Sequence, residues 1–356
     1  MRMFSVGQVI DRNSSVWHQI RTWPKVDLHR HLEGSLRLST LVEIARDYQI
    51  PLPSSSPEAL RPHVQMVETD EASFGVFLSK FGALRQFFRS REIIRRVTVE
   101  AIEDAAADNV KYLELRFTPN ALARHNGYSY EQVIEWVCEA TTYARRKLDM
   151  QVRLIVSVNR HESLAIAERT LAAALDLRCD AIAGVDLAGL EVGHSADPFQ
   201  ALFRQAHAAG LCVTIHAGEW DGPKNIHDAV TRIGADRIGH GVRIVESPRV
   251  LELVRERGVP LEICPTSNLQ TGAVHHLAEH PLAALFEAGL CVTINTDDPS
   301  LSSITLTDEL ALAHVAMGLP LDALKTITQN AAQSAFLPDD DRAALVAQFD
   351  AALCAV

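Results

Sequence analysis

Short runs of apolar and β-branched residues recur along the chain, each followed by a polar or glycine-containing stretch and a segment with helical spacing. This alternation predicts strands joined by helices. The predicted strands cover residues 25–29, 111–117, 151–158, 181–187, 211–216, 237–240, 260–264 and 291–295. Eight strand–helix units in succession predict a parallel sheet, and the number eight favours a closed (β/α)8 barrel of the TIM type.

The intervening segments carry apolar residues at helical spacing. Helices are predicted over residues 91–109, 130–148, 163–177, 198–209, 225–233 and 247–257. The connection from Leu36 to Val110 is too long for one barrel helix, so it predicts extra helices after strand 1, with residues 54–57 as an exposed loop. After Ser300 the pattern predicts further helices that close the C-terminus, and no composition shift divides the single domain expected over residues 1–356.

Two features of the long first connection bear on the fold and the site. An open doubly wound sheet would carry a glycine-rich phosphate loop after its first strand, whereas His29, His31 and Glu33 occupy that position. Within the connection, Phe74, Phe77, Leu78 and Phe81 have helical spacing. They form either an apolar lid over the barrel mouth or a face that packs on the barrel.

Charge and composition narrow the class of substrate. The net charge is −11 and the pI is near 5.7, which argues against nucleic acid as a partner. We expect no signal peptide and no membrane span, and therefore a cytoplasmic protein with a small-molecule substrate. The six cysteines lie far apart without a Cys-x-x-Cys pair, so we expect reduced core residues.

Ionisable side chains stand where four of the predicted strands end. His29 and His31 end the first strand, His216 and Glu219 follow the fifth, His240 ends the sixth, and Asp297 and Asp298 follow the eighth. Strand ends converge on one pocket in such a barrel. Three imidazoles and a carboxylate suit zinc, so we predict His29, His31, His216 and Asp297 as ligands of a catalytic ion that activates water.

The remaining polar residues at the strand ends have competing interpretations. Glu219 is either a proton donor held partly out of water or a solvent-facing acid at a helix start. His240 either orients the attacking hydroxide or holds its proton, and the alternative is a core histidine. Successive aspartates cannot face the same way on a strand, so one of Asp297 and Asp298 is free to meet the substrate. His275, His276 and His280 lie in a polar connection and are predicted at the surface.

Six motifs together resemble the adenosine deaminase family of the amidohydrolase superfamily, over about residues 24–337. They are His-Arg-His-Leu-Glu-Gly at 29–34, Asp-Leu-Ala-Gly at 186–189, His-Ala-Gly-Glu at 216–219, Gly-His-Gly at 239–241, Cys-Pro-Thr-Ser-Asn at 264–268 with Gln-Thr-Gly-Ala at 270–273, and Asn-Thr-Asp-Asp-Pro at 295–299. The resemblance implies one zinc ion per chain and hydrolytic removal of the 6-amino group of a purine nucleoside. The His-x-Glu and Pro-Cys-x-x-Cys signature of the other zinc deaminases is missing, so bases within nucleic acid are not implied as substrates.

The resemblance also implies roles by position. Glu219 would protonate the purine nitrogen N1 as hydroxide attacks C6, and His240 would position and polarise that hydroxide. Asp298 would face N7, and the backbone of Gly189 would face N3. The apolar lid over the purine would include Phe77 and Phe81, with Leu78 between them.

Glu33 is a departure from the family pattern that bears on the substrate. Adenosine deaminases commonly have Asp at this position, on the 5′ side of the sugar, and adenine deaminases often have Glu. The other motifs favour adenosine and 2′-deoxyadenosine, ahead of aminodeoxyfutalosine or free adenine.

Two alternative functions for this site are another type of metal-dependent hydrolase and a binding protein without catalytic activity. A binuclear amidohydrolase would need a bridging lysine near residues 186–189, where there is none. A non-catalytic nucleoside or metal binder is the remaining alternative. The sequence makes no prediction of the oligomeric state.

Overall fold

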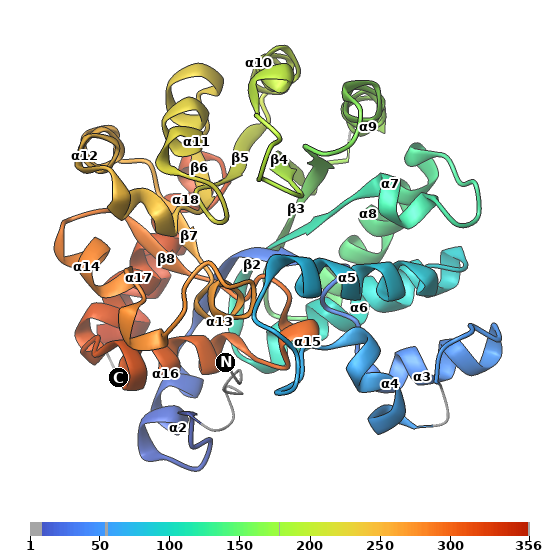
Figure 1. Cartoon of the computed structure of the whole chain (residues 1–356), viewed down its shortest axis with the longest axis horizontal. Coiled ribbons are helices and arrows are strands. Elements are labelled where there is room, and N and C mark those ends of the chain that lie inside the picture. The colour runs from blue at the N-terminus through green and yellow to red at the C-terminus, as the bar shows by residue number, and fades with distance from the viewer. Residues whose placement is uncertain (1–8, 54–55, 178, 355–356) are drawn as a thin grey trace.

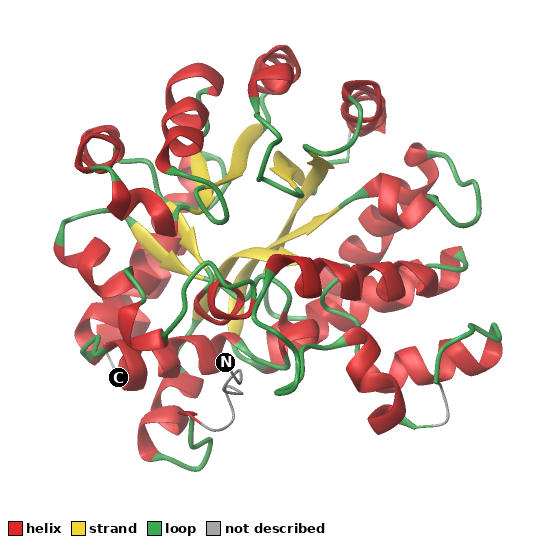
Figure 2. Cartoon of the chain, in the orientation of Figure 1, coloured by secondary structure: helices red, strands yellow, loops and turns green. Residues whose placement is uncertain are grey.

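The computed structural model describes residues 9–53, 56–177 and 179–354, and its eight strands form one parallel sheet in sequence order (Figure 2). The strands are β1 (Lys25–His31), β2 (Val110–Phe117), β3 (Gln151–Asn159), β4 (Ile182–Ala188), β5 (Cys212–Ala217), β6 (Arg237–His240), β7 (Leu261–Ile263) and β8 (Val292–Ile294). Each predicted strand is confirmed, with ends that move by a few residues at most.

The sheet closes where the chain leaves β8 and meets β1. The backbone N–H of His31 donates to the carbonyl of Asp297 at 2.7 Å, and the N–H of Asp297 donates to the carbonyl of His29 at 2.7 Å. These two bonds join the last strand to the first. The predicted (β/α)8 barrel is confirmed, and we call this junction the seam.

Helices surround the strands in a ring (Figure 1). The ring includes α6 (Arg91–Ala107), α8 (Tyr130–Lys147), α9 (Leu164–Leu177), α10 (Gln200–Ala208), α11 (Pro223–Asp228), α12 (Pro248–Arg257) and α14 (Leu282–Glu287). Short turns η2 (Asp197–Phe199) and η3 (Ala229–Ile233) extend α10 and α11, and η4 (Val242–Glu246) and η5 (Leu277–Glu279) precede α12 and α14. Serine side chains begin several helices: Ser90 accepts from the backbone N–H of Ile93, and Ser129 forms a capping box with Gln132.

The extra helices lie where the sequence predicts them. The connection from β1 to β2 contains α3 (Leu38–Asp47), α4 (Pro57–Val64), α5 (Phe74–Leu84) and η1 (Arg85–Phe87) before α6. After β8 come α15 (Pro299–Ser302), α16 (Leu306–Met317), α17 (Leu321–Gln333) and α18 (Asp339–Cys354). The remaining helices are α2 (Ser15–Thr22), α7 (Pro119–Ala123) and α13 (Pro265–Gln270).

The predicted loop at residues 54–57 is not borne out at its second half. Ser56 caps α4 by accepting from the N–H of Ala59 at 3.2 Å, and Pro57 is the first helical residue, a position that suits its fixed φ. Ser54 and Ser55 lie outside the described residues. Among the described helices, none is long and apolar enough to cross a membrane.

Charged residues fill part of the barrel interior. Glu114 and Arg116 stand two positions apart on β2 and therefore point the same way, and both are fully buried. Arg237 on β6 donates from Nε to Oε1 of Glu262 on β7 at 2.6 Å, and Arg116 donates from Nη2 to Oε2 of Glu262 at 2.9 Å. The pattern of apolar positions did not predict this buried network of charges.

The expectation that all cysteines are reduced core residues is wrong at three positions. Cys138 on α8 and Cys179 form a disulfide, with Cα atoms 6.6 Å apart and a separation of 41 positions in sequence. Cys354 is exposed on α18, whereas Cys264 is buried as expected. The packing of α8 against the segment before β4 brings Cys138 and Cys179 together, and their wide separation in sequence gave no sign of it.

The disulfide predicts a thiol count. Titration of the protein denatured without reductant should find four thiols per chain, contributed by Cys212, Cys264, Cys291 and Cys354. The same titration after reduction should find six. Six thiols before reduction would contradict the Cys138–Cys179 bond.

Candidate active site

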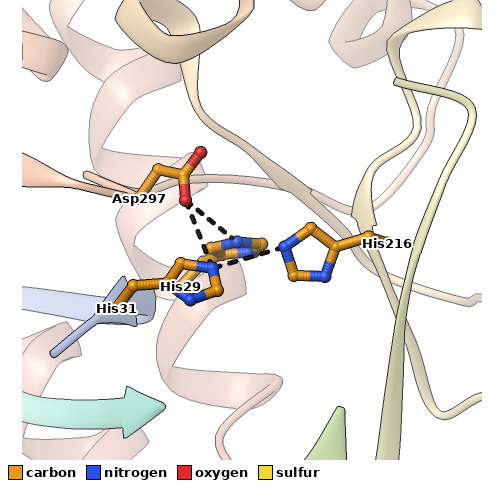
Figure 3. A group of neighbouring side chains, drawn as sticks. All are labelled: His29, His31, His216 and Asp297. Atoms are coloured by element: carbon orange, nitrogen blue, oxygen red, sulfur yellow. Dashed lines mark hydrogen bonds and ion pairs between the residues drawn. The ribbon is translucent and has the colours of Figure 1, made fainter. Parts of the chain in front are cut away.

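Three imidazoles and one carboxylate converge at the carboxyl ends of β1, β5 and β8 (Figure 3). The Nε2 atoms of His31 and His216 are 3.3 Å apart, and Oδ1 of Asp297 lies 3.5 Å from Nε2 of His29 and 3.3 Å from Nε2 of His31. One ligand atom from each of the four residues lies within 4.8 Å of all the others. The sequence predicted this set, and the structure brings it together.

The protonation of the rings tests whether the cluster fits a metal ion. Carboxylates face Nδ1 of His29 (Glu262 Oε2, 2.7 Å) and Nδ1 of His216 (Asp186 Oδ1, 2.9 Å). In its neutral form each ring therefore carries its proton on Nδ1 and directs the Nε2 lone pair into the cluster. Nε2 of His29 is buried without a hydrogen-bond partner. Several lone pairs aimed at one point fit a divalent cation.

Arg116 holds the two orienting carboxylates in place. Its Nη2 contacts Glu262 at 2.9 Å and its Nη1 lies 3.5 Å from Asp186, with all three side chains fully buried. Burial opposes ionisation of Asp186, but the charge of Arg116 and the hydrogen bond from His216 prevail and hold the pKa of this carboxyl well below its usual range. Arg116 and Arg237 do the same for Glu262. Both carboxylates therefore stay ionised.

Glu219 follows β5 on a loop that is fixed by another carboxylate, that of Glu191. Oε1 of Glu191 accepts from the backbone N–H of Gly218 at 2.6 Å, and Oε2 accepts from the N–H groups of Glu219 (3.0 Å), Trp220 (2.8 Å) and Asp221 (3.1 Å). Gly218 has φ +67°, and a Cβ there would lie 2.3 Å from Cδ1 of Ile226. The chain therefore turns tightly after the strand and is held there.

The environment of Glu219 favours its protonated form. Burial raises the pKa of this carboxyl well above its usual range, and the carboxylates of Asp297 and Glu191 raise it further. Thr271 donates from its hydroxyl to Oε1 at 3.2 Å, and Nε2 of His240 lies 3.5 Å from Oε2. Only 4% of Glu219 is exposed, so it is not a solvent-facing acid.

His240 and Asp297 both have backbone conformations that are unusual for residues other than glycine. Their φ angles are +62° and +59°, in the left-handed region. Such strain costs about 1–3 kcal/mol per residue and is concentrated at functional sites. Nε2 of His240 lies 3.8 Å from Oδ2 of Asp297, so the ring faces the cluster.

Asp298 faces a different direction from Asp297. A Cβ built on Gly34 would lie 1.8 Å from Oδ1 of Asp298, so only glycine fits beneath this carboxyl. Oδ1 is buried without a hydrogen-bond partner. Burial and the charges of Asp297 and Glu33 raise the pKa of Asp298. The carboxylates of Asp297 and Asp298 thus point in different directions, as expected for successive residues of an extended chain.

A cavity of about 620 Å³, counted to its open mouth, lies above the cluster. Every site residue predicted from the sequence except His29, which lies beneath, lines it: His31, Glu33, Phe77, Phe81, Gly189, His216, Glu219, His240, Asp297 and Asp298. The sequence did not single out Arg85, Thr118, Asn159, His161, Trp220 and Ser267, which also line it.

The apolar face of α5 covers part of this cavity. Phe77, Leu78 and Phe81 line the cavity, and Phe74 stacks on Trp220 with ring centroids 5.3 Å apart. The structure therefore supports the interpretation of this segment as an apolar lid over the barrel mouth, ahead of a face that only packs on the barrel.

Glu33 lies on the side of the cavity formed by β2 and β3. Its Oε1 accepts from the N–H of Thr118 at 2.8 Å, while Oε2 is buried without a partner. Burial raises the pKa of this carboxyl. Across the same region, Gly189 has φ +86°, and a Cβ there would lie 2.5 Å from Nδ1 of His161. Gly189 and His161 therefore lie in close contact, and both line the cavity.

One predicted surface histidine is not at the surface. His275 and His276 are exposed as expected, but His280 is only 6% exposed. Burial lowers the pKa of His280 to about 3, so the ring is neutral. Asp186, quoted above only as part of a motif, and Glu262 had no predicted role; their signal was a charged residue within an otherwise apolar strand.

Known proteins resemble this chain over nearly its whole length. The family model described as adenosine deaminase matches residues 24–352. The adenosine deaminase of Erwinia tasmaniensis is 37% identical over 328 residues, covering 92% of this chain and 98% of the relative. The adenosine deaminase of Klebsiella pneumoniae is 38% identical over 323 residues, covering 91% of this chain and 96% of the relative.

Solved structures share the fold. An adenine deaminase from Arthrobacter aurescens superposes with a TM-score of 0.86 at 28% identity, covering 92% of this chain and 98% of the other. An amidohydrolase from Burkholderia ambifaria with bound Zn has a TM-score of 0.86 at 26% identity, covering 97% and 96%. The N6-methyl-AMP deaminase from Arabidopsis thaliana has a TM-score of 0.81 at 28% identity, covering 94% and 98%.

The orientation of His216 predicts how metal affinity depends on Asp186. The Asp186→Asn variant keeps the shape of the side chain but loses the charge that aligns His216, so zinc affinity should fall about 10- to 100-fold. Competition with a chelator of known affinity measures this change. In the matched control Ser157→Ala, only the hydroxyl that donates to Asp186 at 3.0 Å is removed, and affinity should change much less. Equal affinities in wild type and Asp186→Asn would refute the orienting role.

Proposed function

The chain belongs to the adenosine deaminase family, and from this we propose that it hydrolyses adenosine and 2′-deoxyadenosine to inosine and 2′-deoxyinosine with release of ammonia. One observation carries the proposal. The metal-ligand set of three imidazoles and Asp297 opens into the same cavity as Glu219 and His240. Hydrolysis of a 6-aminopurine needs an activated water and a proton donor, and these groups supply both requirements.

We assign one zinc ion per chain to His29, His31, His216 and Asp297. The set of donors, the partnerless Nε2 of His29 and the zinc in the structure from Burkholderia ambifaria support the assignment. A zinc ion in this position supplies water with its pKa lowered from about 15.7 to about 7. The end of β4, at residues 186–189, offers no lysine to bridge a second ion.

Glu219 supplies a proton in the reaction, and His240 orients the attacking oxygen. Glu219, whose burial favours the protonated carboxyl, donates its proton to N1 of the purine. Protonation of N1 makes C6 electrophilic, so that the oxygen of water adds to it. Of the two protons that this water gives up, one leaves with the 6-amino group as ammonia and the other restores the protonated carboxyl of Glu219. His240, with Nε2 at 3.5 Å from Glu219, lies where it can orient the attacking oxygen.

The residues that line the cavity offer contacts for a purine and for a sugar. Asp298 would contact N7, the backbone of Gly189 would contact N3, and Phe77 and Phe81 would cover the ring. Asn159, His161, Arg85 and Glu33 line the same cavity as Gly189, and Oε2 of Glu33 is buried without a hydrogen-bond partner. These polar groups, which the purine contacts above do not use, support a nucleoside over free adenine.

Free adenine remains the second candidate, because of Glu33 and the likeness to the adenine deaminase from Arthrobacter aurescens. The test is to incubate the zinc-loaded protein with adenosine, 2′-deoxyadenosine, adenine and aminodeoxyfutalosine in parallel, measuring ammonia and the ultraviolet change from 6-amino- to 6-oxopurine. We expect the highest kcat/KM with the first two. A higher value with adenine or aminodeoxyfutalosine would change the substrate, and no ammonia from any of the four would leave a non-catalytic binder.

The role of Glu219 predicts a loss of turnover without a loss of metal. Glu219→Gln keeps the shape of the side chain but cannot transfer a proton, so kcat should fall at least about 100-fold while zinc content is unchanged. Steady-state kinetics with adenosine and metal analysis measure the two quantities. Glu252→Gln, on the exposed surface of α12, is the matched control and should behave as wild type. Turnover at the wild-type rate in Glu219→Gln would refute the assigned role.

A further inference from the structure

A buried histidine outside the cavity is connected to His240 by hydrogen bonds. The backbone N–H of Leu282 donates to Nδ1 of His280 at 3.1 Å. Nε2 of His280 lies 3.3 Å from Oδ1 of Asn268, and Nδ2 of Asn268 lies 3.1 Å from Nδ1 of His240. Asn268 is fully buried on α13, and His280 ends η5 just before α14. Residues 40 positions apart in sequence are thereby joined in one line.

The direction of each hydrogen bond follows from the first donor. A backbone N–H only donates, so Nδ1 of His280 accepts and the proton of this neutral ring is on Nε2. That proton is donated to Oδ1 of Asn268, which turns the amide nitrogen toward His240. The amide nitrogen only donates, so Nδ1 of His240 accepts. Protonation of His280 would put a proton on Nδ1 and prevent it from accepting from Leu282. Its pKa of about 3 keeps the ring neutral near neutral pH.

We propose that His280, acting through Asn268, fixes His240 in the tautomer that carries its proton on Nε2. Nε2 of His240 faces the cavity, with Oε2 of Glu219 at 3.5 Å and Oδ2 of Asp297 at 3.8 Å. His240 then acts on the attacking oxygen as a hydrogen-bond donor and not as the base that takes its proton. Asn268 and His280 are positioning residues, since neither of them touches the reacting atoms.

The effect on catalysis rests on the proposed function, whereas the position of the proton on His240 follows from the hydrogen bonds alone. The other orientation of the Asn268 amide would place a carbonyl oxygen against Nδ1 of His240 and move the proton to that nitrogen. Nε2 would then be an acceptor, and the attacking oxygen would lose its donor. Wrong-tautomer states of catalytic histidines lower turnover steeply.

Nitrogen NMR of the zinc-loaded protein, selectively labelled with ¹⁵N-histidine, tests the tautomer without any substrate. The His240 signals are assigned as those that are lost in a His240→Asn sample. We expect a protonated Nε2 and an unprotonated Nδ1 at neutral pH. A proton on Nδ1 in the wild-type protein would overturn the inference, whatever the enzyme does with adenosine.

Substitution of His280 tests the connection. His280→Leu removes the donor to Asn268, so a second His240 tautomer should appear in the spectrum and kcat should fall about 10- to 100-fold, with a smaller change in KM. His280→Gln offers both an amide donor and an acceptor for Leu282, and should restore the single tautomer and most of kcat. His276→Leu, the same change at an exposed histidine nearby, is the control.

Three outcomes separate the claims. A single Nε2-protonated tautomer in His280→Leu would show that Asn268 needs no support from His280, and would overturn the proposal. Equal losses of kcat in His280→Leu and His280→Gln would do the same, since they would indicate a packing role. Failure to deaminate adenosine despite the expected tautomer would overturn the proposed function and leave the hydrogen-bond chain supported.

Discussion

The ionic contacts of Arg116 inside the barrel determine the direction of the metal-ligand rings. Glu262 and Asp186 are held on either side of its guanidinium, and each fixes Nδ1 of one histidine, so the Nε2 atoms of His29 and His216 face the cluster. Loss of one partner from a buried ion pair typically costs about 3–5 kcal/mol. The site therefore depends on charges that lie one layer below it, out of reach of any substrate.

Above that layer, other contacts and backbone conformations hold the catalytic groups in place. Glu191 gathers the backbone N–H groups of the loop that carries Glu219, while the glycine at position 34 makes room for Asp298. The left-handed conformations of His240 and Asp297 persist because the surrounding structure enforces them. The groups that would meet the substrate are thus placed before it arrives, which reduces the reorganisation that the reaction requires.

The sequence predicted the barrel and the groups at its strand ends because both depend on local periodicity. The pattern of apolar residues within a strand is visible in its own short segment of sequence. Parallel strands of a barrel bring their carboxyl ends together whatever connections lie between them. The missed residues depend on partners that are remote in sequence: Glu262 contacts His29 across 233 positions, and Asp186 contacts His216 across 30. His280 lies in a polar stretch and is buried only because α13 and α14 pack around it. The pairing of Cys138 with Cys179 likewise arises from helix packing.

The seam between β8 and β1 gives the metal site a thermodynamic link to the barrel itself. Asp297 exchanges backbone hydrogen bonds with His29 and His31 while its carboxylate faces both rings. An ion held by these side chains would therefore clamp the two strands whose pairing closes the sheet. If such an ion binds only the folded chain and is present at a thousand times its dissociation constant, it adds ~4.1 kcal/mol to the free energy of unfolding. Metal supply would then govern the stability of the folded protein as well as its chemistry.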